Sequence, residues 1–63
     1  MTNDERELWT IGPVACVMIS CCAGAELQIR SGDRILLREL YPTKSDLYER
    51  ARTLEAEHRA APG

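Results

Sequence analysis

The chain has 63 residues, a formal net charge of −2 and hydrophobic residues at 44% of its positions. This composition is typical of one soluble globular domain and excludes a disordered chain, because disorder requires low hydrophobicity and high net charge. A net charge this close to zero provides no overall attraction to nucleic acids or anionic membranes. A domain of this size buries only about 60% of the surface that its unfolded chain exposes. We therefore expect a disulfide, a metal or a second subunit to add stability.

The first seven residues, MTNDERE, are polar and are predicted to form a flexible acidic tail before a single small domain over residues 8–63. This segment lacks the basic start and the apolar stretch of a signal peptide. The longest apolar run, Val14–Ile19, is much shorter than the ~20 residues that span a bilayer. Three cysteines without a disulfide pattern are typical of a reducing compartment, so we expect a cytoplasmic protein.

Short β-prone segments follow one another along the first two thirds of the chain. Leu8–Ile11 ends at Gly12-Pro13 and is a possible short N-terminal strand, because proline is confined to the ends or edges of strands. The next three segments are rich in β-branched and apolar residues or alternate between apolar and polar residues, which predicts strands. These are Val14–Cys21, Glu26–Arg30 and Arg34–Tyr41.

The register of these strands is predicted by matching their apolar faces. Three-residue loops at Cys22–Gly24 and Ser31–Asp33 bring the apolar residues of the three strands to one face, whereas a slip by one residue separates them. In the first loop, glycine is the third residue, where a left-handed backbone is needed. The apolar face then consists of Ala15, Val17, Ile19, Leu27, Ile29, Ile35 and Leu37.

A helix is predicted after Tyr41-Pro42, with Thr43 or Ser45 as its N-cap. Its apolar stripe at helical spacing consists of Leu47, Ala51, Leu54 and His58. Ion pairs at the same spacing are expected between Asp46 and Arg50 and between Glu55 and Arg59. The predicted fold is α+β: a three-stranded antiparallel meander, with a possible fourth short N-terminal strand, covered on one face by a C-terminal helix.

A single helix leaves the other sheet face uncovered, and several apolar residues are predicted to lie there. Scattered apolar side chains are common on protein surfaces, and the N-terminal piece could instead fold back over them. We favour an interface, because a second subunit would supply the missing stability. The sequence thus predicts a small non-catalytic protein-interaction module, most simply a homodimer, or one that binds another protein. The interface candidates are Trp9, Cys16, Met18, Leu36 and Leu40.

Arg30, Arg34 and Arg38 are predicted to lie on the same uncovered face, with Arg30 directly opposite Arg34. Like charges that face one another are unfavourable unless an anion lies across them. This arrangement suggests an alternative function, a nucleic-acid-associated accessory protein that contacts the phosphate backbone. The negative net charge and the absence of any nucleic-acid-binding motif argue against it.

No catalytic, cofactor or metal site is predicted. Cys16, Cys21, Cys22 and His58 are the candidate metal ligands, but their spacing does not provide the paired C-x2-4-C ligands of structural zinc. No C-x-x-C motif supports a redox site, and SCCAGAE is interpreted as the corner of a hairpin. His58 is expected to be partly buried on the helix stripe, without a placed catalytic partner.

The segment ILLRELYPTKSDLYERARTLE joins a strand that ends in Tyr-Pro to a helix that carries alanine and arginine. It resembles short bacterial proteins of sheet-then-helix type whose activity is not established. The resemblance covers about a third of the chain and implies no catalytic residue.

Overall fold

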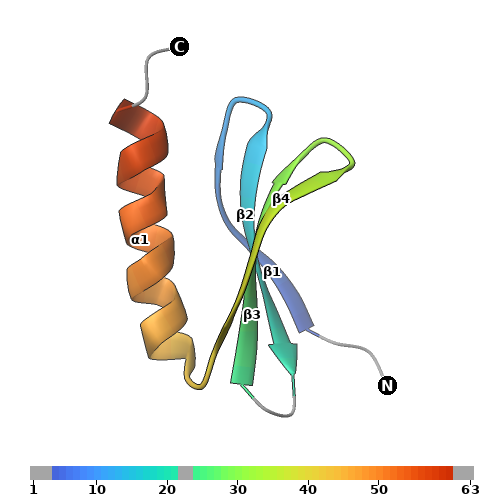
Figure 1. Ribbon diagram of the computed structural model, residues 1–63, viewed down its shortest axis with the longest axis vertical. Coiled ribbons are helices and arrows are strands. Elements are labelled where there is room, and N and C mark those ends of the chain that lie inside the picture. Colours follow the sequence, from blue (N-terminus) through green and yellow to red (C-terminus); the bar gives the residue numbers. More distant parts are fainter. Residues whose placement is uncertain (1–3, 22–23, 61–63) are drawn as a thin grey trace.

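The computed structural model describes residues 4–21 and 24–60 and shows an antiparallel sheet with one helix packed on it (Figure 1). The sheet has four strands in the order β1-β2-β3-β4. Their bounds are β1 Asp4–Ile11, β2 Val14–Cys21, β3 Gly24–Ser31 and β4 Arg34–Tyr41, and the helix α1 spans Lys44–Ala60. The α+β prediction is confirmed, including the fourth N-terminal strand. That strand is longer than expected, because residues 4–7, which the sequence assigns to a tail, belong to β1.

The first and last hairpins turn through two residues each. Ile11 pairs with Val14 across Gly12-Pro13, and Ser31 pairs with Arg34 across residues 32–33. Each turn begins with a glycine at positive φ, +58° in the first and +61° in the second, and no other residue type in the described chain has positive φ. A positive φ at the first central residue followed by a negative φ at the second is typical of a type II′ turn, which matches the twist of antiparallel strands. The predicted three-residue loop at residues 31–33 is therefore wrong.

The central hairpin also differs from its predicted register. Cys21 pairs with Gly24, so the loop consists of residues 22–23, which lie outside the described part of the chain, and Gly24 belongs to β3. A Cβ at Gly24 would lie 2.3 Å from the carbonyl oxygen of Tyr41, and its φ is +137°. Glycine is needed there because another backbone passes close by, rather than because it ends a three-residue loop.

The central loop is one residue shorter than predicted, and this change in register reverses which side chains of β2 face the helix. Cys16 pairs with Ile29 and Met18 pairs with Leu27, and these side chains lie beneath the helix. Val17 pairs with Gln28, on the face that turns away from the helix. The predicted helix-covered face is therefore wrong for Ala15, Val17, Ile19 and Ile35, and right for Leu27, Ile29 and Leu37.

Each edge strand contains one extra residue that changes which side chains share a face. In β1 the pairing passes from Glu7 to Trp9 and leaves Leu8 unmatched. In β4 the pairing passes from Ile35 to Leu37 and leaves Leu36 unmatched. Such β-bulges shift the alternation of side chains by one position. The bulge at Leu8 is the reason that Trp9 turns toward the helix although Glu5 and Glu7 lie on the opposite face.

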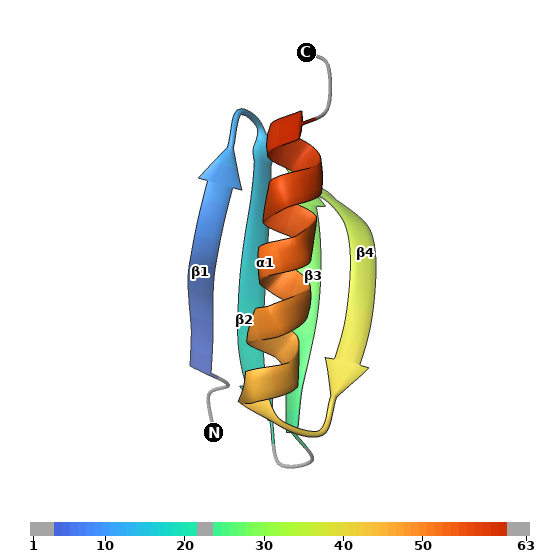
Figure 2. The same ribbon diagram turned by 90° about the vertical axis from the view of Figure 1, so that its left-hand side faces the viewer.

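The helix lies across the middle of the sheet, over β2 and β3, with β1 and β4 on either side (Figure 2). It begins after Thr43, whose hydroxyl accepts a hydrogen bond from the Asp46 amide at 3.2 Å, which confirms Thr43 as the N-cap. Leu47, Ala51 and Leu54 are buried against the sheet, as the predicted stripe requires.

Polar contacts hold the helix at both edges of the sheet. The indole N–H of Trp9 donates to the carbonyl oxygen of Ala51 at 2.9 Å, and the Trp9 ring packs against His58 with centroids 5.5 Å apart. On the β4 side, Arg50 forms an ion pair with Glu39 at 3.2 Å, so the expected pairing of Arg50 with Asp46 is wrong. The expected Glu55–Arg59 pair is present at 2.8 Å.

Candidate functional site

The predicted interface residues separate into two groups in the structure. Trp9, Cys16 and Met18 are buried in the core beneath α1, so the prediction that they lie on the uncovered face is wrong. Leu36 and Leu40 are exposed on β4. The cause for Cys16 and Met18 is the register of the central hairpin, and the cause for Trp9 is the bulge in β1.

We call the sheet face that turns away from α1 the open face. Its centre holds a row of hydrogen-bonded polar side chains: Glu5, Arg30, Gln28, Glu26 and Arg38. Arg30 donates to both carboxylate oxygens of Glu5 at 3.3 Å and to the Gln28 amide oxygen at 2.8 Å. The Gln28 amide nitrogen donates to Glu26, and Arg38 donates to the same carboxylate at 3.0 Å. These bonds from Gln28 and then Arg38 hold the pKa of Glu26 below its usual value.

The middle of the open face is closed off from solvent by its own side chains. Val17 and Gln28, which are register partners, are each only 5% exposed although no helix covers them. The Gln28 side-chain oxygen accepts a hydrogen bond from Arg30, and its side-chain nitrogen donates one to Glu26. Burial of this amide therefore leaves neither its oxygen nor its nitrogen unsatisfied. The centre of this face is therefore a compact polar layer and not the broad apolar surface that the sequence predicts.

The apolar surface of the open side is concentrated on the edge strand β4. Leu40 is 75% exposed, Leu36 is 55% exposed and Ile35 is 48% exposed, and these are the most exposed large aliphatic side chains of the described residues. Residues 35–38 also line a shallow depression. Three large aliphatic side chains on one strand form an apolar strip, which we call the β4 strip and define as Ile35, Leu36 and Leu40.

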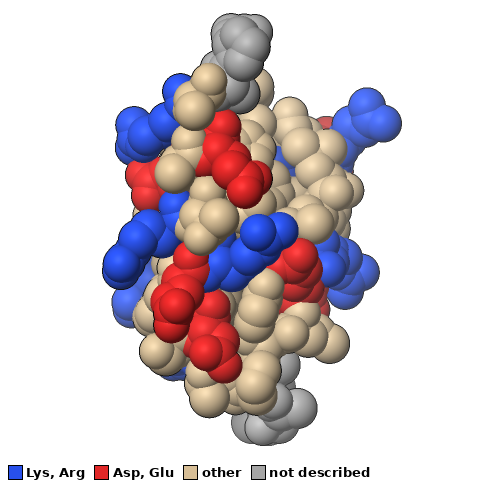
Figure 3. All heavy atoms as spheres, turned by 60° about the vertical axis from the view of Figure 1, so that its left-hand side comes forward, with Lys and Arg blue, Asp and Glu red and all other residues tan. Residues whose placement is uncertain are grey.

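The predicted arginine cluster is partly neutralised. Arg30 is paired with Glu5 and Arg38 with Glu26, so only Arg34 of the three lacks a carboxylate partner in the part of the chain that the structure describes. Arg34 pairs in register with Ser31, and the expected Arg30–Arg34 opposition is absent because Arg30 lies opposite Ile35. On the helix side, acidic and basic side chains are interspersed (Figure 3). The nucleic-acid alternative stays a prediction.

Among the cysteines, the structure describes the side chain of Cys16 only. It is free and completely buried. Burial, together with the nearby carboxylate of Glu55, raises the pKa of the Cys16 thiol from an ordinary 9.0 to about 11. A thiol with this pKa is protonated at neutral pH and is a poor nucleophile and metal ligand. Within residues 4–21 and 24–60, no group of three or more His, Cys, Asp or Glu side chains is arranged to hold a metal ion.

The Cys16 thiol is expected to make stability fall at alkaline pH. Because its pKa is raised in the folded state, its contribution is fully present below pH 9 and is lost as the pH rises from about 9 to about 11. The difference between the thiol pKa of 9.0 and that of about 11 in the folded state corresponds to a loss of about 3 kcal/mol in the free energy of unfolding. Urea unfolding between pH 8 and pH 11 measures it. A Cys16→Ala variant should show a smaller loss over the same range, and identical pH dependence of the two proteins would contradict the expectation.

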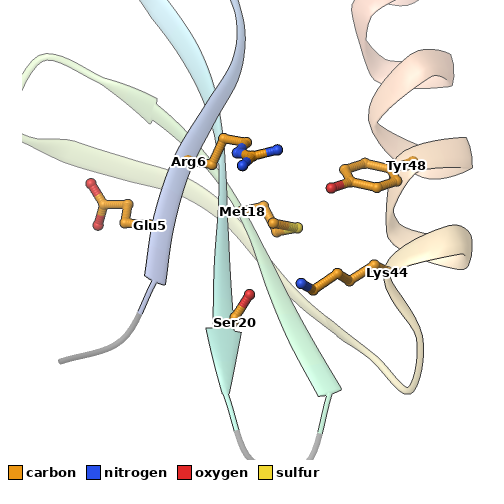
Figure 4. A pocket seen from close by; sticks show the side chains of 6 residues that line it. All are labelled: Glu5, Arg6, Met18, Ser20, Lys44 and Tyr48. Atoms are coloured by element: carbon orange, nitrogen blue, oxygen red, sulfur yellow. The ribbon is translucent and has the colours of Figure 1, made fainter. Parts of the chain in front are cut away.

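A second site, which the sequence did not indicate, lies where α1 begins beside the start of β1 and the end of β2. Side chains from all three elements line a cavity of about 180 Å³: Glu5, Arg6, Met18, Ser20, Lys44 and Tyr48 (Figure 4). Arg6 pairs in register with Met18 and therefore lies on the helix side of the sheet. Sequence reasoning missed this group because it placed residue 6 in a tail and Met18 on the opposite face.

No described helix combines the length and the apolar character that crossing a membrane requires. Searches against protein-family models, curated proteins and solved structures return no match to this chain.

Proposed function

We propose that this chain is a small non-catalytic protein-interaction module that forms a homodimer through the β4 strip and the neighbouring open face. The observation that carries the proposal is the exposure of Leu40, at 75%, together with that of Leu36 and Ile35. Burying a side chain of this size contributes about 1.5–3 kcal/mol. A domain of 63 residues has a small core, and a second copy on this strip would add apolar burial that one chain cannot supply.

The charges of the open face support contact between two identical copies. The polar row contains two carboxylates, Glu5 and Glu26, and two guanidinium groups, Arg30 and Arg38, so its formal charges cancel. Two copies of this face therefore do not repel one another through the row. Twofold contacts of this self-complementary kind are the most common in soluble oligomers.

The edges of the sheet favour packing of faces over pairing of edges. Both edge strands are bulged, at Leu8 in β1 and at Leu36 in β4. Bulges and charged residues on edge strands oppose the addition of another strand. The Arg34 and Arg38 side chains of β4 add such charges. We therefore place the dimer contact on the open face, with the β4 strip at its apolar margin.

Sedimentation equilibrium tests the proposal. The wild-type chain is expected to show a dimer mass at high micromolar concentration, and the double variant Leu36→Glu/Leu40→Glu is expected to be a monomer. Both side chains are more than half exposed, so the variant should keep its fold, as measured by circular dichroism. Ala56→Glu, at an exposed position of α1, is the control and should remain dimeric. A wild-type monomer at every concentration, or a double variant with wild-type mass, would overturn the proposal.

A further inference from the structure

The cavity at the start of α1 contains two basic side chains without an acidic partner. Arg6 of β1 and Lys44 of α1 both line it, and neither side chain forms an ion pair or hydrogen bond with any residue that the structure describes. Four other arginines, at positions 30, 38, 50 and 59, are paired with carboxylates. Lys44 is also the first residue of α1, where the positive end of the helix dipole disfavours a cation. The cavity therefore gathers positive charge that no described side chain compensates.

Two hydroxyl groups lie beside these cations. The Ser20 hydroxyl oxygen is buried and has no hydrogen-bond partner within residues 4–21 and 24–60. Buried hydroxyls without partners reduce stability and are rare in native proteins, unless water or a ligand satisfies them. The Tyr48 hydroxyl points from α1 into the same space, toward Arg6 (Figure 4). Four groups that can donate hydrogen bonds thus converge from two strands and the helix.

Among the described residues that line the cavity, the one carboxylate does not oppose an anion. Glu5 points to the other side of β1 (Figure 4), where both its oxygens accept hydrogen bonds from Arg30 at 3.3 Å. Asp46, in the first turn of α1, is exposed and does not line the cavity. Met18 supplies an apolar wall. The described part of the lining is therefore cationic and rich in donors, and its one acidic group is engaged elsewhere.

We propose that this cavity binds a small phosphate-bearing ligand. Two cations match the two negative charges of a phosphate dianion, and the guanidinium of Arg6 can donate two parallel hydrogen bonds to phosphate oxygens. Lys44 adds a point charge, and the Ser20 and Tyr48 hydroxyls donate to the remaining oxygens. A volume of about 180 Å³ is several times the ~30 Å³ that one water molecule occupies in the liquid. The cavity has room for a phosphoryl group with a short substituent.

Titration of the full chain with inorganic phosphate, followed by amide chemical shifts at constant ionic strength, tests this site. We expect saturable shifts at Arg6, Ser20, Lys44 and Tyr48. Arg6→Ala and Ser20→Ala are each expected to weaken phosphate binding about tenfold or more, because each removes a hydrogen bond to a charged group. Arg52→Ala removes an exposed arginine that does not line the cavity and should leave the affinity unchanged.

Ser20→Ala separates a binding role from a structural one. Without phosphate, its melting temperature should equal or exceed that of the wild type, because an unsatisfied hydroxyl is removed. With phosphate, its stabilisation should be smaller than that of the wild type. Absence of saturable shifts, unchanged affinity in Arg6→Ala and Ser20→Ala, or equal binding of acetate would overturn the proposal. Shifts at Arg34 and Arg38 with an oligonucleotide, but none with phosphate, would also overturn it.

Discussion

Replacing Trp9 by alanine is expected to abolish stable folding. Trp9 joins β1 to α1 through the hydrogen bond from its indole N–H to the Ala51 carbonyl, and its ring lies in the core against His58. Removal of a buried tryptophan side chain costs about 3–5 kcal/mol. A domain of this size has a total stability of about 3–5 kcal/mol, so the loss equals most or all of it.

A conservative variant separates the contribution of the Trp9 hydrogen bond from that of its aromatic ring. Trp9→Phe keeps an aromatic ring but loses the donor, and it should cost about 1–2 kcal/mol and leave a cooperative transition. Tyr48→Ala, at a half-exposed position of α1, is the control and should cost about 1 kcal/mol or less. Trp9 is the single tryptophan of the chain, so its replacement removes the tryptophan fluorescence that would otherwise report unfolding. Unfolding in urea is therefore followed by far-ultraviolet circular dichroism. Wild-type stability of Trp9→Ala would show that the indole does not hold β1 to the helix.

An aspartate at Cys16 is expected to prevent folding, whereas an aspartate at Ala15 is expected to be tolerated. Cys16 is completely buried beneath α1, and this burial, together with the nearby Glu55 carboxylate, already raises the pKa of its thiol. A second carboxylate there would be buried without a cation and would cost more than about 3 kcal/mol. Ala15 lies on the open face, where its register partner is Arg30, so the same substitution should cost about 1 kcal/mol or less.

This pair of variants tests the register of the central hairpin directly. The apolar face predicted from the sequence places Ala15 under the helix and Cys16 outside, whereas the observed pairing reverses the two. Circular dichroism and amide-shift dispersion should show a folded Ala15→Asp protein and an unfolded Cys16→Asp protein. The opposite result would support the register predicted from the sequence and contradict the observed one.

Local signals were sufficient for the elements of this fold. Glycine and proline mark the ends of the strands, and the spacing of Leu47, Ala51 and Leu54 identifies the buried side of the helix. Thr43 was one of two predicted N-caps, and it is the one that accepts the Asp46 amide. These features depend on residues within about four positions of one another, so the amino-acid order alone determines them.

Register could not be determined in the same way. Both alternating faces of β2 are apolar, with Cys16 and Met18 on one side and Val17 and Ile19 on the other, so the pattern accepts either face beneath the helix. The close approach of Gly24 to the Tyr41 carbonyl accompanies the shorter central loop, and only the paired strands reveal it.

The candidate sites depend on the same long-range packing. The bulges at Leu8 and Leu36 change the alternation within β1 and β4, which turns Trp9 inward and leaves the β4 strip exposed. Arg50 reaches Glu39 across to β4 instead of Asp46 along its own helix. The phosphate-site candidates Arg6, Ser20 and Lys44 come together only when the helix packs on the sheet. The amino-acid order thus determined the strands and the helix, because those depend on neighbours, whereas the faces and both candidate sites depend on contacts between distant segments.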